Sequence, residues 1–134
     1  MASITVKKFD GTTDIVYDQI SASGGDNSPA VWRQDTGAAA GLPVGLRPTF
    51  KLMAKWNGPK TARVLVPEFV YPYAVQDSTT TLYSAKDRVV YANGAFTMPQ
   101  GVPANVLNEA SAQALNLMSS ALIKSSMASG YAPS

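Results

Sequence analysis

A change of hydrophobic period near Pro103 divides this 134-residue chain into two parts. Before it, short segments alternate apolar and polar residues, which is the period of half-buried strands. After it, apolar residues recur every three or four positions through about Ser125, as on one face of a helix. We therefore expect one α+β domain over residues 1–134, with an N-terminal β-hairpin, an antiparallel sheet of about five strands and a C-terminal α-helix.

The N-terminal part predicts one hairpin and one short strand. β-branched residues on both sides of Asp10-Gly11 indicate a hairpin over residues 1–20. A loop should follow, and then Ala30–Gln34 should begin the sheet of residues 30–98. Thr36–Gly45 contains too much Gly and Ala to hold a strand, so we expect a flexible connection there.

The clearest strand pattern lies over Arg47–Asn57. An apolar set alternates with a more polar set, and the polar set is Thr49, Lys51, Met53 and Lys55. A three-residue loop at Asn57-Gly58-Pro59 would place Lys55 opposite Thr61 and Met53 opposite Arg63. That register would put Arg63 on the same face as the two lysines.

The segments after this hairpin predict less regular strands. Pro67 and Pro72 cannot donate ladder hydrogen bonds, so their strand should lie near an edge, bend or end. A loop at Gln76–Thr80 precedes a strand-like segment over Leu82–Met98. Gly94 indicates a bulge in that segment, although Asn93-Gly94 is also a strong turn signal.

The helix expected over residues 103–126 has an apolar stripe too wide for one contact surface, and a short tail of residues 127–134 follows it. One helix would also leave a face or an edge of the sheet exposed, which monomers avoid. We therefore expect a two-fold dimer formed through the sheet and the helix. The expected interface residues on the helix are Leu107, Ala114, Leu115, Met118 and Leu122.

Composition argues against most enzyme chemistry. The chain has no Cys and no His, so it lacks thiolate nucleophiles, the commonest neutral-pH base and the commonest zinc ligands. Its nine acidic residues are scattered, which gives no reason to expect a cleft with two converging carboxylates. We predict a non-enzyme without metal or cofactor. No apolar signal core or membrane-spanning stretch is present, so a cytosolic chain without a membrane partner is expected.

Basic charge gathers in one interval of the sequence. The net charge of +2 is too small to indicate nucleic-acid binding. Between Asp35 and Glu68, however, there is no acidic residue and there are five basic ones. A solvated sheet face would explain them without any ligand. The sharper interpretation is a phosphate-binding surface, because RNA affinity comes mainly from neutralising the backbone.

Three strings resemble coat proteins of single-stranded RNA bacteriophages of the levivirus type. They are NGPKTARV at Asn57–Val64, YANGAFTMP at Tyr91–Pro99 and NEASAQALNLMSSALIKSS at Asn108–Ser126. The first and third resemble the Pseudomonas-infecting branch, and the second resembles the coliphage branch. The resemblance covers about Ala30 to Ser126. It implies the coat-protein fold, with an interlocked dimer whose sheets join edge to edge and whose open sheet face looks at RNA.

The resemblance also implies a function. Many dimers would close into an icosahedral shell, the virion capsid, which assembles in the bacterial cytoplasm around a single-stranded RNA genome with a maturation protein. The inner face would bind an operator hairpin and repress replicase translation. RNA-binding residues carried over from the family are Arg63, Tyr91 and Asn93, and strand phase adds Thr49, Lys51 and Lys55. The loop at the symmetry axes would be Gln76, Asp77, Ser78, Thr79 and Thr80. The segment after Ser126 is too short and too rich in Gly and Pro for the family's second helix.

Simpler interpretations stay open. Tyr91 would serve equally as a cross-strand packing residue and Asn93 as a turn residue, and Trp32 and Trp56 would be core or interface anchors. For the whole chain, one alternative is a single-stranded RNA-binding regulator that does not assemble. The other is an oligomeric scaffold that binds no RNA.

Overall fold

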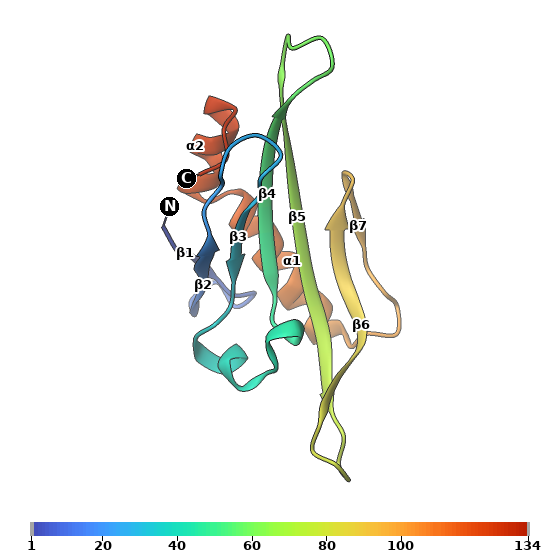
Figure 1. Ribbon diagram of the computed structural model, residues 1–134. Coiled ribbons are helices and arrows are strands. Elements are labelled where there is room, and N and C mark those ends of the chain that lie inside the picture. Colours follow the sequence, from blue (N-terminus) through green and yellow to red (C-terminus); the bar gives the residue numbers. More distant parts are fainter. Residues whose placement is uncertain (1, 134) are drawn as a thin grey trace.

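The computed structural model describes residues 2–133, apart from the side chains of Ala38 and Ala39, so the predicted end residues Met1 and Ser134 lie outside it. Seven antiparallel strands form one sheet in chain order, and two helices lie over one of its faces (Figure 1). The expected α+β class is confirmed. The strands are β1 (Ile4–Lys7), β2 (Asp14–Ser21), β3 (Ala30–Arg33), β4 (Thr49–Trp56), β5 (Arg63–Gln76), β6 (Tyr83–Ala92) and β7 (Ala95–Thr97); the helices are α1 (Ala104–Met118) and α2 (Ala121–Ser129).

The N-terminal hairpin is part of the sheet. Strands β1 and β2 pair with each other, and β2 also pairs with β3 through Asp18–Arg33 and Gln19–Trp32. This second pairing is why the sheet has seven strands where about five were expected beside a separate hairpin. The buried face of the sheet carries Tyr17, Trp32, Phe50 and Phe69, which are all fully buried in the core shared with α1. We call this the covered face and the opposite one the open face.

The predicted register of the β4–β5 hairpin is wrong. Trp56 pairs with Arg63 and Lys55 pairs with Val64, because the loop spans residues 57–62 and not three residues. The side chain of Asn57 holds this wider loop: its Oδ1 accepts hydrogen bonds from the backbone nitrogens of Thr61 (2.8 Å) and Ala62 (3.2 Å). A register shift by an odd number of residues moves every side chain to the other face. Arg63 therefore lies on the covered face.

Strand β5 does not end at its prolines. It pairs with β4 over residues 63–70 and with β6 over residues 69–76, so the two ladders overlap only at Phe69 and Val70. Pro67 lies where only β4 is a neighbour, and Pro72 lies where only β6 is one. Each proline thus occupies an edge-like position, where a missing N–H donor is tolerated. This stagger sends the β4–β5 hairpin and the β5–β6 hairpin out at opposite ends of the sheet (Figure 1).

The segment expected as one strand over Leu82–Met98 is a hairpin. Ala92 pairs with Ala95, and the two residues between them, Asn93 and Gly94, have φ of 54° and 79°. Two positive φ angles in a two-residue loop are the signature of a type I′ turn. Gly94 is therefore a turn residue and not a bulge, and the register shift in this part of the sheet lies at Tyr73/Ala74.

The expected single helix over residues 103–126 is two helices. Ser119 ends α1 and Ser120, with φ −65° and ψ 153°, precedes α2. Their hydroxyls donate to the carbonyl oxygens of Asn116 (3.1 Å) and Leu117 (2.7 Å), so they compete with the regular helical pattern. The second helix begins before the segment after Ser126, which was expected to be too short for a helix, and that segment supplies only its last residues up to Ser129. It ends at Gly130 in the left-handed conformation.

Candidate nucleic-acid interface

The open face holds three of the predicted RNA-binding residues. Thr49, Lys51 and Lys55 alternate along β4 with the buried residues of the covered face. No helix of the described residues lies over this face (Figure 1). Lys51 is exposed, and Thr49 and Lys55 are half-buried by their cross-strand neighbours.

Valines and a few charges surround these residues. Val64, Val66 and Val70 of β5 pair with Lys55, Met53 and Thr49, so the row of side chains beside β4 is apolar except at Glu68. Arg33 of β3 pairs with Thr49, and Arg88 of β6 pairs with Pro72, which adds basic residues on both sides. The open face therefore carries separate cationic side chains surrounded by a largely apolar surface.

The strand register also places an acidic side chain beside the basic residues of the open face. Glu68 pairs directly with Lys51, although the two residues are 17 positions apart in the sequence. No ion pair joins them within the described residues. Opposite charges on neighbouring strands still attract at this spacing. The face is less basic than the acid-free interval of the sequence indicates.

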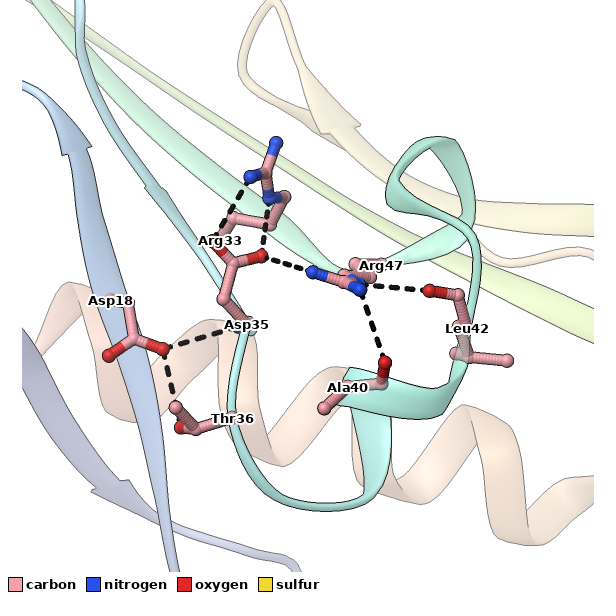
Figure 2. A network of polar contacts seen from close by, with 7 residues as sticks. All are labelled: Asp18, Arg33, Asp35, Thr36, Ala40, Leu42 and Arg47. Carbon is pink, nitrogen blue, oxygen red and sulfur yellow. Dashed lines mark hydrogen bonds and ion pairs between the residues drawn. The ribbon is translucent and has the colours of Figure 1, made fainter.

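One end of the open face carries a network centred on Asp35 (Figure 2). Arg33 forms a bidentate pair with Asp35, at 2.6 and 3.0 Å, and Arg47 donates to the same carboxylate at 2.8 Å. The Arg33 hydrogen bonds lower the pKa of Asp35 most, and those from Arg47 lower it further, against the opposing effect of burial. Arg33 is therefore already ion-paired, unlike Lys51.

Arg47 uses its other nitrogens to fix the connection between β3 and β4. It donates to the carbonyl oxygens of Leu42 (3.0 Å) and Ala40 (3.1 Å), as Figure 2 shows. The segment expected as a flexible connection contains two short 3-10 turns, at Gly37–Gly41 and Val44–Leu46. The sequence contains many small residues there, but a single arginine, Arg47, at the end of the second turn organises them.

Arg63 is not beside the lysines. Its guanidinium forms a bidentate pair with Asp26, at 3.0 and 2.7 Å, and its Nε donates to the carbonyl oxygen of Gly130 at 2.8 Å. It also lies between the rings of Trp56 and Tyr131, at 4.8 and 4.1 Å from their centroids. With 11% of the side chain exposed, Arg63 is a structural clamp on the C-terminal residues. Its placement on a shared basic face was wrong because the register was wrong.

Tyr91 and Asn93 are not on the open face either. Tyr91 pairs with Phe69, so it shares the covered face, and its ring lies 4.4 Å from that of Phe96. Tyr91 packs against the core, as the simpler interpretation held. Asn93 is the first residue of the β6–β7 turn. The structure thus brings neither residue close to Lys51 and Lys55 on one surface.

The predicted symmetry-axis loop is an exposed turn. Gln76 still belongs to β5, and Asp77, Ser78, Thr79 and Thr80 lie in the connection to β6. Hydrogen bonds from the backbone nitrogens of Thr79 (2.7 Å) and Thr80 (3.2 Å) hold the pKa of the Asp77 carboxyl below its ordinary value. Asp77 therefore shapes the turn.

The predicted helix interface residues divide into two groups. Ala114 is fully buried in the chain's own core, and Leu107, Met118 and Leu122 pack against that core. Leu115, in contrast, is 58% exposed on the outer side of α1. Of the five predicted interface residues, Leu115 is the one that its own chain leaves free.

Sequence reasoning missed a buried polar network between α1 and the sheet. Tyr17 donates to Oε1 of Gln113 (2.7 Å), and Nε2 of Gln34 donates to both Tyr17 (2.8 Å) and Gln113 (2.7 Å). Burial raises the pKa of Tyr17 well above its ordinary value. Gln113 lies on the same face of α1 as Ala110 and Leu117, so its position in the helical repeat could have indicated that it is buried.

Among residues 2–133, no helix is long and apolar enough to cross a membrane and no metal-binding cluster occurs.

Comparison with solved structures identifies the fold. A virus-like particle of bacteriophage NT-214 matches over 96% of this chain and 95% of that chain, with 10% identity and a TM-score of 0.55. A virus-like particle of Beihai levi-like virus 21 matches over 95% and 92%, with 12% identity and a TM-score of 0.52. The chain has the fold of these particle proteins. No family model and no curated protein matches its sequence. The particle fold thus agrees with the levivirus-type resemblance of the three strings.

Proposed function

We propose that this chain is the coat subunit of a single-stranded RNA bacteriophage, which pairs and assembles into a closed icosahedral shell around RNA. The observation that carries this proposal is the match to two virus-like particles over almost the whole of both chains. Because the match covers almost all of both chains, it favours a shared architecture of the whole domain rather than a shared local motif. The exposed Leu115 on α1 and the exposed edge strand β7 are surfaces that such pairing would cover.

The RNA-facing surface in this proposal is the open face, with Thr49, Lys51 and Lys55 at its centre. Lys51 and Lys55 would neutralise phosphates, and the valine row of β5 would lie under the sugars and bases. Tyr91 and Asn93 are left out, because their positions on the covered side and in the turn do not favour base stacking from the open face. RNA would then be held mainly by charge. No residue pattern on the open face favours repression through an operator hairpin.

Assembly and RNA content can be tested together. The chain would be expressed in bacteria, separated by size-exclusion chromatography with the nucleic-acid and protein absorbances recorded across the peak, and viewed by negative-stain microscopy. Uniform round particles that contain RNA are expected. A small dimer that holds RNA would indicate the non-assembling regulator, and RNA-free oligomers would indicate the scaffold.

The open face is tested by charge removal with a matched control. Lys51→Ala together with Lys55→Ala should make the negative slope of log affinity against log salt less steep by about 1.4, because each single-strand phosphate contact contributes about −0.7. Lys8→Ala together with Lys124→Ala removes the same charge from the helix side of the molecule. The control pair should leave the slope unchanged. Equal slopes for the two double variants would exclude the open face as the RNA surface.

A further inference from the structure

Two Asn-Gly pairs occur in the chain, and the structure treats them differently. Asn57-Gly58 begins the β4–β5 loop, and Asn93-Gly94 forms the β6–β7 turn. Asn-Gly is the dipeptide most prone to spontaneous deamidation, because glycine has no side chain to shield its backbone nitrogen. Neither glycine has any atom within 4 Å of the position that a Cβ would take. Crowding at the glycine therefore does not distinguish the two pairs.

The side chain of Asn57 is held in place. Its Oδ1 accepts from the backbone nitrogens of Thr61 and Ala62, and its Nδ2 donates to Oγ1 of Thr61 at 3.1 Å. Its backbone carbonyl also accepts from Lys60 at 3.0 Å. For the Asn57 carboxamide to reach the Gly58 nitrogen, these hydrogen bonds must break together, which opens the whole loop.

The side chain of Asn93 has no such restraint. It is exposed and makes no hydrogen bond with any residue in the described range 2–133. The turn is closed only by β7, a three-residue edge strand whose residues are all exposed. Short exposed segments of this kind open at low free energy. Opening of the turn is therefore the one step that separates Asn93 from a reactive geometry.

We infer that Asn93-Gly94 is a site of spontaneous deamidation in the folded protein and that the hydrogen bonds of Asn57 protect Asn57-Gly58. The Gly94 nitrogen attacks Cγ of Asn93, the bond from Cγ to Nδ2 breaks, and the nitrogen's proton passes through solvent to the departing ammonia. Water then opens the five-membered imide at either carbonyl carbon. One opening yields aspartate, and the other yields isoaspartate, in which the main chain runs through Cγ.

The modification would change the sheet edge. Each product adds one negative charge at the β6–β7 turn, and isoaspartate also lengthens a two-residue loop that requires positive φ at both positions. The pairing of β7 with β6 spans only three residue pairs, so a longer loop should release this edge strand. This inference is independent of the proposed coat function.

The test is mass spectrometry of the full-length protein held at mildly alkaline pH, with and without denaturing urea. Tryptic peptides separate the two sites, and fragmentation locates the replacement of NH2 by OH. In the folded protein we expect Asn93 to react at least about tenfold faster than Asn57, which is the ratio given by an opening free energy lower by about 1.4 kcal/mol. In urea the two rates should be similar. The Asn93→Ser variant should lose the modified peptide.

Three results would overturn the inference. Asn57 reacting as fast as Asn93 in the folded protein would show that its hydrogen bonds give no protection. Both sites unreactive in the folded protein, over a time that converts the urea-treated chain, would show that the β6–β7 turn does not open. The same rate ratio with and without urea would show that local sequence and not the fold decides reactivity.

Discussion

The two faces of the sheet use the same kinds of residue in opposite ways. On the covered face, the guanidinium of Arg63 is paired with Asp26 and lies between two aromatic rings. On the open face, Lys51 and Lys55 have no ion-pair partner among the described residues, and the apolar neighbours are valines without a covering layer. The charge of Arg63 thus stabilises the fold, whereas the charges of Lys51 and Lys55 remain available for a ligand.

The largest difference between the faces should appear on β5 itself. Phe69 is fully buried on the covered face, and Val66 is half-buried on the open face. Phe69→Ala should lower the free energy of unfolding by about 3–5 kcal/mol, because it leaves a cavity in the core. Val66→Ala should cost less than about 1 kcal/mol. Urea unfolding of both variants measures the difference, and similar midpoints would mean that both faces are buried in the isolated protein.

A second comparison contrasts the two kinds of cation. Arg63→Ala should lower the free energy of unfolding by about 2–3 kcal/mol, because charged hydrogen bonds and ring contacts are lost and Asp26 keeps no partner. Lys55→Ala should change it by less than about 0.5 kcal/mol. Thermal unfolding of the two variants, with Lys124→Ala as a surface control, measures both. A tolerated Arg63→Ala would contradict the clamp on Gly130 and Tyr131.

The two faces also show which features of the fold could be predicted from the sequence. The alternation over β4 correctly separates Phe50 and Leu52 from Lys51, because strand period depends only on local residues. The face of Arg63 depends on the length of the loop before it, and that length is decided by hydrogen bonds that Oδ1 of Asn57 accepts from backbone nitrogens four and five positions later. The partner of Lys51 likewise depends on register, which brings Glu68 across from it. Faces within one strand are therefore predictable, whereas relations between strands require the loop geometry.

The Asp35 network should make part of the stability depend on pH. Its carboxyl pKa is lower in the folded state than the ordinary value of 3.8, so its contribution is present above that value and is lost as the pH falls through the folded pKa. The wild-type protein should therefore lose more stability below about pH 4 than Asp35→Asn does. Urea unfolding across this pH range measures the difference. Parallel pH profiles would indicate that Arg33 and Arg47 do not stabilise the ionised carboxylate.

The smallest expected effect concerns Glu68, whose negative charge should weaken RNA binding to the open face. Glu68→Gln keeps the size of the side chain and removes the negative charge opposite Lys51. Because the group is exposed and screened, the variant should bind single-stranded RNA only about twofold more tightly at moderate salt, and the gain should disappear at high salt. Its stability should stay within about 0.5 kcal/mol of the wild type.

The matched control is Asp87→Asn. Asp87 is an exposed acid that pairs with Tyr73 on the covered side, so its replacement should leave affinity unchanged. An equal gain from both variants would mean that net charge alone governs binding, whereas a gain from Glu68→Gln alone locates the phosphates over Lys51.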